Sequence, residues 1–146
     1  MTEISFHFNV ADKWEYSCRL LRKATGTGAR TAVTADPVDL HRLDQRLWEL
    51  DPVEFIAHCS AERADSRMLE ASAVVFCESL SAAPHDQVLL NLGPGVPAGF
   101  ERFARLIEVV GCDDADRARA RARWKHYTSR GYAINRLDRA DKDAHR

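Results

Sequence analysis

Short apolar segments alternate with segments of helical periodicity along this chain of 146 residues. The clearest apolar segments are residues 73–77 (Ala-Val-Val-Phe-Cys) and 87–92 (Gln-Val-Leu-Leu-Asn-Leu), which lack the in-out alternation of a half-exposed strand. Strands of this kind are typical of parallel sheets, because crossover helices cover both faces of such a sheet. The sequence therefore predicts a central, mostly parallel sheet.

Three further strands and four helices complete the predicted order. The further strands are expected at residues 4–10, at residues 31–35 and at residues 55–58, the last of which can instead be an extended segment outside the sheet. Helices are expected at residues 13–25, 37–50, 100–110 and 114–132. The polar residues 60–72 are expected to form a surface loop. This order is that of an α/β protein, so we predict a sheet of four to five strands with helices on both faces.

The last predicted helix, residues 114–132, has two stripes of side chains along it. The basic stripe consists of Arg117, Arg121 and Lys125. The apolar stripe consists of Ala120, Trp124 and Tyr127. Like charges at i, i+4 cost a helix about a few tenths of a kcal/mol per pair. We therefore expect an acidic partner that compensates for this repulsion.

Charge is unevenly distributed along the chain. Residues 117–146 hold 10 Lys and Arg against 3 Asp and Glu, which leaves 11 against 19 for residues 1–116. This asymmetry indicates either an interaction surface near the C-terminus or a solvated tail. We expect residues 1–135 to form a single α/β domain and residues 136–146 to be a charged tail that need not be ordered. With neither a membrane-spanning run nor a secretory signal in the sequence, we expect a cytoplasmic protein without a membrane partner.

The sequence lacks the motifs of common catalytic and cofactor sites. It contains no G-x-G-x-x-G, no G-x-x-x-x-G-K-[ST] and no G-x-S-x-G. The six histidines lack metal-binding spacing, and the four cysteines include no C-x-x-C pair. Gly26-Thr-Gly28 follows a predicted helix, so we interpret it as a C-cap and not as a phosphate-binding loop. We expect no catalytic residue, no cofactor and no metal, and an enzyme with a site at the strand ends is the least favoured function.

A tryptophan bordered by basic residues can bind two kinds of acidic partner. It can stack on the bases of a single-stranded nucleic acid, or it can receive an acidic peptide that ends in an aromatic residue with a free carboxylate. Periodicity does not separate these two hypotheses. A third interpretation needs no partner, because Trp124 and Tyr127 can be the buried face of the helix and the arginines its solvated face.

Several short motifs follow one another along almost the whole chain. They are Phe6-His-Phe8, Leu43-Asp-Gln-Arg-Leu-Trp48, Phe55-Ile-Ala-His58, Val88-Leu-Leu-Asn-Leu92, Phe103-Ala-Arg-Leu-Ile-Glu-Val-Val110, and Ala120-Arg-Ala-Arg-Trp-Lys-His-Tyr127 with Gly131-Tyr132. In this order the chain resembles the chi subunit of the bacterial DNA polymerase III holoenzyme, an accessory protein of the clamp-loader complex. The most specific part is the combination of L-D-x-x-L-W with A-R-x-R-W/Y-K-x-Y-x-x-x-G-Y/F.

The resemblance implies a Rossmann-like α/β fold without catalysis, in a bacterial protein that acts at replication forks. The implied task is to link the clamp loader to single-stranded DNA-binding protein by binding its acidic, Phe-terminated tail, so that contact with DNA is mostly indirect. The tail-binding residues of the family match Arg117, Arg121, Trp124 and Lys125. Arg121 is expected to bind the terminal carboxylate, because a guanidinium can form a bidentate pair with it.

The resemblance also implies a second partner surface. In the family this surface receives the psi subunit of the clamp loader or, in some members, a repair helicase. It matches Trp48 and Phe55 here, although the family's F-x-P-H pattern reads Phe55-Ile-Ala-His58 without the proline. From the residues alone, Trp48 and Phe55 could equally belong to the core.

Overall fold

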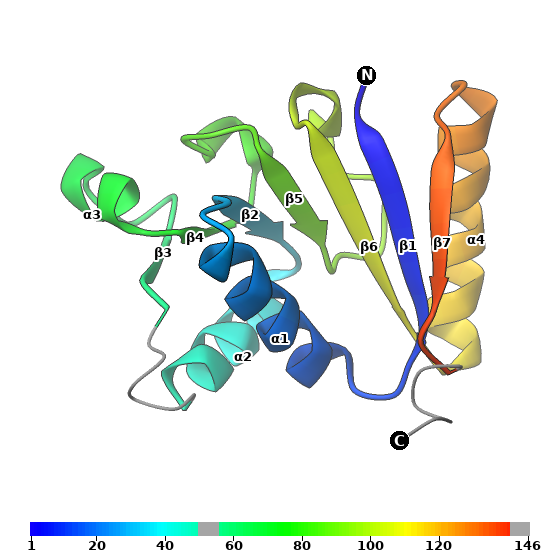
Figure 1. The fold of residues 1–146 in the computed structure, drawn as a ribbon, viewed down its shortest axis with the longest axis horizontal. Helices are drawn as coiled ribbons and strands as arrows, with labels where there is room; N and C mark the ends of the chain where they lie inside the picture. Colours follow the sequence, from blue (N-terminus) through cyan, green and yellow to red (C-terminus); the bar gives the residue numbers. More distant parts are fainter. Residues whose placement is uncertain (50–55, 141–146) are drawn as a thin grey trace.

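The computed structural model of the protein describes residues 1–49 and 56–140. Within these residues, seven parallel strands form one sheet in the order β3-β4-β2-β5-β6-β1-β7 (Figure 1). The strands are β1 (Glu3–Val10), β2 (Thr31–Thr34), β3 (His58–Ser60), β4 (Val74–Cys77), β5 (Val88–Asn91), β6 (Arg105–Gly111) and β7 (Ile134–Asp138). The helices are α1 (Lys13–Gly26), α2 (Pro37–Trp48), α3 (Ser66–Ala71) and α4 (Asp114–Ser129), with the short 3-10 helices η2 (Leu80–Ala82) and η3 (Phe100–Arg102). The predicted α/β class is confirmed, but the sheet has more strands than the four to five expected.

Each face of the sheet has its own apolar core. The helices α1 and α2 cover one face, and α4 lies against the other (Figure 1). Successive strand residues point to opposite faces, so Leu89 belongs to the core under α4 and Leu90 to the core under α1 and α2. Ala32 and Val33 of β2 are divided in the same way. All four residues are at most 1% exposed, which explains why these strands read as apolar throughout.

Residues 100–110, which we predicted as a helix, form η3 and β6 instead. Apolar residues recur there at helical spacing, but the residues from 105 onward alternate between the two faces of the sheet as a strand. Leu106 and Val110 belong to the core on the α4 side, and Glu108 points to the same side between them. β6 pairs with both β5 and β1, so its backbone hydrogen bonds are satisfied on two sides.

Three other segments differ from the prediction. α3 forms inside residues 60–72, where we expected only a loop. β3 begins at His58, where the predicted strand ended, and residue 55 lies outside the described residues. β7 was not predicted, and it runs across the boundary between residues 135 and 136 at which a charged tail was expected to begin.

A buried network of polar side chains joins α4 to the sheet. The carboxylate of Glu108 accepts hydrogen bonds from Tyr127 at 2.5 Å, from Arg123 Nε at 3.1 Å and from Asn91 at 3.0 Å. All four side chains are between 0% and 2% exposed. Burial raises the pKa of Glu108, and the Arg123 charge together with the three donors opposes that rise. Arg123 also donates to the Pro94 carbonyl at 3.1 Å, so this network fixes α4 against the loop after β5 as well.

Replacing Arg123 by Met should lower the free energy of unfolding by about 3 to 5 kcal/mol, because it leaves the Glu108 carboxylate buried without its cation. Arg119→Met is the matched control on the same helix. The Arg119 side chain in the ion pair with Asp116 is 47% exposed, so loss of this pair should cost less than about 1 kcal/mol. Urea denaturation of both variants measures the difference. Equal losses would contradict the structural role of Arg123.

His7 of β1 is a buried histidine that stays neutral at pH 7. Its Nδ1 is hydrogen-bonded to the Tyr16 hydroxyl of α1 at 2.5 Å, and the guanidinium of Arg139 lies 5.1 Å from the Tyr16 ring centroid. Burial lowers the pKa of His7 from 6.5 to about 4, and the positive charges of Arg139, Arg105 and Lys23 add to this effect.

Because the pKa of His7 is depressed in the folded state, the unfolded chain binds more protons between pH 6.5 and pH 4. The stability that neutral His7 contributes is therefore fully present above pH 6.5 and is lost as the pH falls toward 4. We expect His7→Gln to reduce the acid-induced loss of unfolding free energy in this window by up to about 3 kcal/mol. Thermal or urea unfolding from pH 7.5 to pH 4 measures the two curves. Parallel curves for wild type and variant would contradict the role given to His7.

Candidate partner-binding pocket

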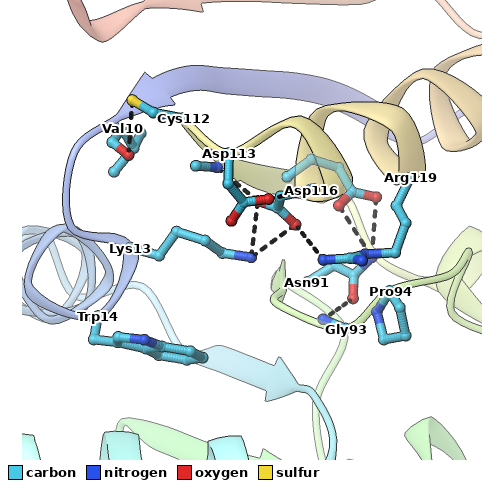
Figure 2. Close-up of polar contacts among 12 residues, drawn as sticks. Val10, Lys13, Trp14, Asn91, Gly93, Pro94, Cys112, Asp113, Asp116 and Arg119 are labelled. Carbon is cyan, nitrogen blue, oxygen red and sulfur yellow. Dashed lines mark hydrogen bonds and ion pairs between the residues drawn. The ribbon is translucent and has the colours of Figure 1, made fainter.

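A cluster of charged residues fixes the start of α4. Asp113 is the N-cap, and its carboxylate accepts a hydrogen bond from the backbone N–H of Asp116 at 2.6 Å. Asp116 lies between Lys13 and Arg119 (Figure 2), with Lys13 Nζ at 3.3 Å and Arg119 Nη2 at 3.4 Å. Although burial acts in the opposite direction, the hydrogen bond from Gly111 N–H and the charge of Lys13 hold the pKa of Asp116 below its usual value. The cluster thereby joins the first turn of α4 to β6 and α1.

Between α4 and the β1–β7 edge of the sheet lies a pocket of about 420 Å³. Figure 1 shows α4 running alongside these two strands. The pocket is lined by Phe6, Phe8 and Asn9 of β1, Val110 of β6, Arg117, Ala120, Arg121 and Trp124 of α4, and Arg136 of β7. Its walls are therefore mainly apolar, and its charged groups are all arginines.

Aromatic rings form the apolar wall of the pocket. Phe6 and Phe8 point to the same side because they lie two residues apart on a strand. The Phe6 ring lies 5.1 Å from the Trp124 ring and 6.0 Å from the Tyr127 ring, centroid to centroid. Tyr127 is fully buried, whereas Trp124 is half-buried and lines the pocket. The interpretation of both residues as the buried helix face is therefore right for Tyr127 and incomplete for Trp124.

Two of the arginines at the pocket differ in their partners. Arg117 donates a hydrogen bond to Oδ1 of Asn9 at 2.9 Å. Within the part of the chain that the structure describes, Arg121 makes no hydrogen bond and no ion pair. Its side chain is exposed at the pocket and can bind an anion without first losing a protein partner. Lys125 is exposed one turn further along α4 and does not line the pocket.

Asn9 connects three elements at the pocket. It adopts a left-handed backbone conformation with φ 58°, at the point where the β1–β6 register shifts between His7 and Val10. Asparagine tolerates this conformation better than most residues. Its Nδ2 donates to Asp138 of β7 at 3.0 Å, while its Oδ1 accepts from Arg117 of α4. The bulge thus orients an amide between the edge strand and the helix.

Of the four residues expected to bind a partner tail, the structure brings Arg117, Arg121 and Trp124 together at this pocket and leaves Lys125 outside it. Sequence reasoning did not assign Phe6, Phe8, Asn9, Val110 or Arg136 to the site. The alternation in Phe6-His-Phe8 is a signal that could have indicated a shared aromatic face. Arg136 carried no such signal, because it fell in the segment read as a charged tail.

The second expected surface is partly described. Trp48, at the end of α2, is 61% exposed, so the alternative that places it in the core is wrong. Its ring packs edge-on against His58 at 5.1 Å between centroids, and His58 Nε2 lies 3.0 Å from Asp44. Phe55 lies outside the described residues. A second hollow of about 160 Å³ lies beside this region and includes Asp44 and Phe76 in its lining.

Cys18 and Cys77 are buried free cysteines. Burial raises the pKa of Cys18 to about 11 and that of Cys77 to about 12, so both thiols stay protonated and unreactive at neutral pH.

Among residues 1–49 and 56–140 we find no group of three or more potential metal ligands. Over the same residues, none of the helices combines the length and the apolar character needed to cross a lipid bilayer.

Fold and pocket together define a parallel α/β protein with an aromatic recess bordered by arginines. A family model described as DNA polymerase III chi subunit, HolC, matches residues 1–135, and the chain belongs to this family. It is 30% identical over 141 residues to the DNA polymerase III subunit chi of Pseudomonas aeruginosa, a match that covers 92% of this chain and 94% of that protein. It is 25% identical over 122 residues to the DNA polymerase III subunit chi of Haemophilus influenzae, with 83% of each chain covered. These matches confirm the resemblance seen in the sequence and a non-catalytic, accessory role in replication.

Proposed function

We propose that this protein links the clamp loader of DNA polymerase III to single-stranded DNA-binding protein by binding the acidic C-terminal tail of that protein in the aromatic pocket. The observation that carries the proposal is Arg121, a guanidinium without a partner among the described residues, at the border of a pocket with an aromatic wall. A peptide that ends in an aromatic residue presents a matching pair of groups, because its last side chain and its terminal carboxylate are adjacent.

In this arrangement Arg121 forms a bidentate pair with the terminal carboxylate. The terminal aromatic side chain enters the recess beside Phe6 and Trp124, where ring contacts add to the gain from apolar burial. Arg117 faces the same pocket but keeps its hydrogen bond to Asn9. Its charge therefore attracts the acidic residues of the tail that precede the terminal residue, without forming a hydrogen bond to any of them. Lys125 lies outside the pocket and contributes to the long-range attraction of the tail.

Arg121→Gln should weaken binding of a labelled peptide that carries the last residues of the tail by about 1.5 to 3 kcal/mol, because the terminal carboxylate loses its charge-assisted hydrogen bonds. Arg119→Gln removes the same charge from the same helix on the side held by Asp116, and it should change the affinity little. Fluorescence anisotropy measures both variants. Amidation of the peptide's C-terminus should weaken its binding to the wild-type protein as much as Arg121→Gln weakens binding of the unmodified peptide. With the Arg121→Gln protein, amidation should weaken binding little further. Unchanged affinity for Arg121→Gln, or for a peptide without its terminal aromatic residue, would contradict the site.

Direct binding of single-stranded DNA by α4 is the alternative function, and a gel-shift experiment distinguishes it from binding of the tail. Phosphate contacts would give an affinity that falls steeply with salt, whatever the sequence of the strand. We expect no gel shift of bare single-stranded DNA at moderate salt by the protein alone, and a shift when single-stranded DNA-binding protein with an intact tail is present. A salt-sensitive shift without that protein would support the alternative.

We further propose that the surface around Trp48 receives the second partner, either the psi subunit of the clamp loader or a repair helicase. A tryptophan that is 61% exposed at a helix end is a frequent anchor of protein interfaces.

Trp48→Ala should reduce affinity for that partner by about 2 kcal/mol or more, the scale of an interface hot spot. Because the side chain is mostly exposed, stability should change by less than about 1 kcal/mol. Isothermal calorimetry with each candidate partner, together with the tail peptide as a control that should bind normally, measures the effect. A variant that binds both candidates as wild type does would exclude Trp48 from the interface.

A further inference from the structure

Arg136 lines the pocket from a position that no sequence signal pointed to. It lies on β7, the edge strand, in register opposite Phe6 of β1. Its guanidinium carbon is 5.6 Å from the centroid of the Phe8 ring and 5.5 Å from that of the Trp124 ring. The guanidinium therefore contacts one ring of the sheet and one ring of α4.

Arg136 has no anionic partner within the described residues. Asp138, two residues further on the same side of β7, is held by other groups. Its carboxylate accepts hydrogen bonds from Asn9 Nδ2 at 3.0 Å and from the backbone N–H of Ala140 at 3.0 Å. The guanidinium of Arg136 thus lies against aromatic rings and not against a carboxylate, in an exposed position at the recess.

We propose that Arg136 is a specificity-determining residue of this pocket, whose guanidinium forms a cationic wall that selects an aromatic side chain at the end of the bound peptide. The inference rests on the proposed function and adds to it a residue that recognises the ring. Arg121 and Arg136 then have different roles: Arg121 binds the terminal carboxylate, and Arg136 packs against the terminal ring.

The chemistry of the guanidinium supports this division. It is planar and more weakly hydrated than an ammonium group, so it stacks on aromatic faces at a small desolvation cost. An aromatic ring attracts a cation through its quadrupole, whereas a saturated ring of the same shape does not. A volume of about 420 Å³ leaves room for a phenyl side chain beside Phe6 and Ala120. A ring that enters there meets Trp124 and Arg136 as neighbouring walls.

The test compares two tail peptides that differ only in the terminal side chain, one ending in phenylalanine and one in cyclohexylalanine. The two side chains have similar shape, and the second lacks the π system. We expect Arg136→Gln to weaken binding of the phenylalanine peptide by about five- to tenfold, which corresponds to the loss of one cation–π contact. Binding of the cyclohexylalanine peptide should weaken by less than about twofold. Anisotropy titrations give the four dissociation constants of the wild-type and Arg136→Gln proteins with the two peptides. A salt concentration of 150 mM, about physiological, screens long-range attraction between charges.

Two further variants separate specificity from charge. Arg130→Gln removes a positive charge at the end of α4 outside the pocket, and it should leave the ratio of the two affinities at its wild-type value. Arg121→Gln should weaken both peptides by the same factor, because both carry the carboxylate. Thermal unfolding of Arg136→Gln checks that the edge of the sheet stays folded, and Arg136→Lys, which keeps the charge, serves as a second variant if it does not.

The outcomes have distinct meanings. The inference is supported if Arg136→Gln lowers the preference for the phenylalanine peptide over the cyclohexylalanine peptide, while Arg130→Gln and Arg121→Gln leave that preference unchanged. Equal weakening of both peptides by Arg136→Gln, or no weakening of either, overturns it while the proposed tail site stands. Failure of the wild-type protein to bind either peptide overturns the proposed function itself, and the inference with it.

Discussion

The buried pairing of Glu108 with Arg123 is the interaction on which the rest of the structure depends. A carboxylate and a guanidinium that are at most 2% exposed cannot exchange partners for water, so α4 has one position along the sheet. A slide of one helical turn, about 5.4 Å, would separate both Arg123 and Tyr127 from the carboxylate. Glu108 lies in register opposite Phe6, so the same contact also sets where Trp124 meets the aromatic wall of the pocket. A structural ion pair thereby determines the geometry of a surface recess.

The four arginines at alternate positions of α4 divide between the two sides of the helix. Successive members are about 200° apart around the axis, so each residue shares a side with the member four positions away. Arg119 and Arg123 pair with Asp116 and Glu108, and they attach the helix to the protein. Arg117 and Arg121 border the pocket. The like-charge repulsion at i, i+4 is therefore compensated internally for Arg119 and Arg123, whereas Arg117 and Arg121 have no acidic partner among the described residues.

How much could be read from the sequence depends on whether partners are near or far along the chain. Strands such as β4 and β5, apolar on both faces, and the leucine-spaced α2 carry their own signals, and they were predicted closely. β6 was misread because Glu108 interrupts an apolar alternation, and the residue that makes its burial tolerable, Arg123, lies 15 positions away. β7 was missed because an edge strand with mostly exposed residues has a polar sequence. For the candidate site, helical spacing indicated Arg117, Arg121 and Trp124, whereas the residues from β1, β6 and β7 required the sheet order.

The place of the pocket at the sheet edge has a thermodynamic consequence. β7 pairs with β1 in the described sheet and is mostly exposed, so we expect it to open more readily than the central strands. Side-chain contacts fasten it to the rest of the protein, among them those of Asn9 with Asp138, of Asn135 with Glu3, and of Arg136 with the rings of Phe8 and Trp124. Any occupant that touches both α4 and Arg136 binds only the form in which β7 is in place, and by mass action it stabilises that form. Binding in the recess and ordering of the edge strand are therefore coupled, because the same arginine serves as a wall of the pocket and as a clamp on the strand.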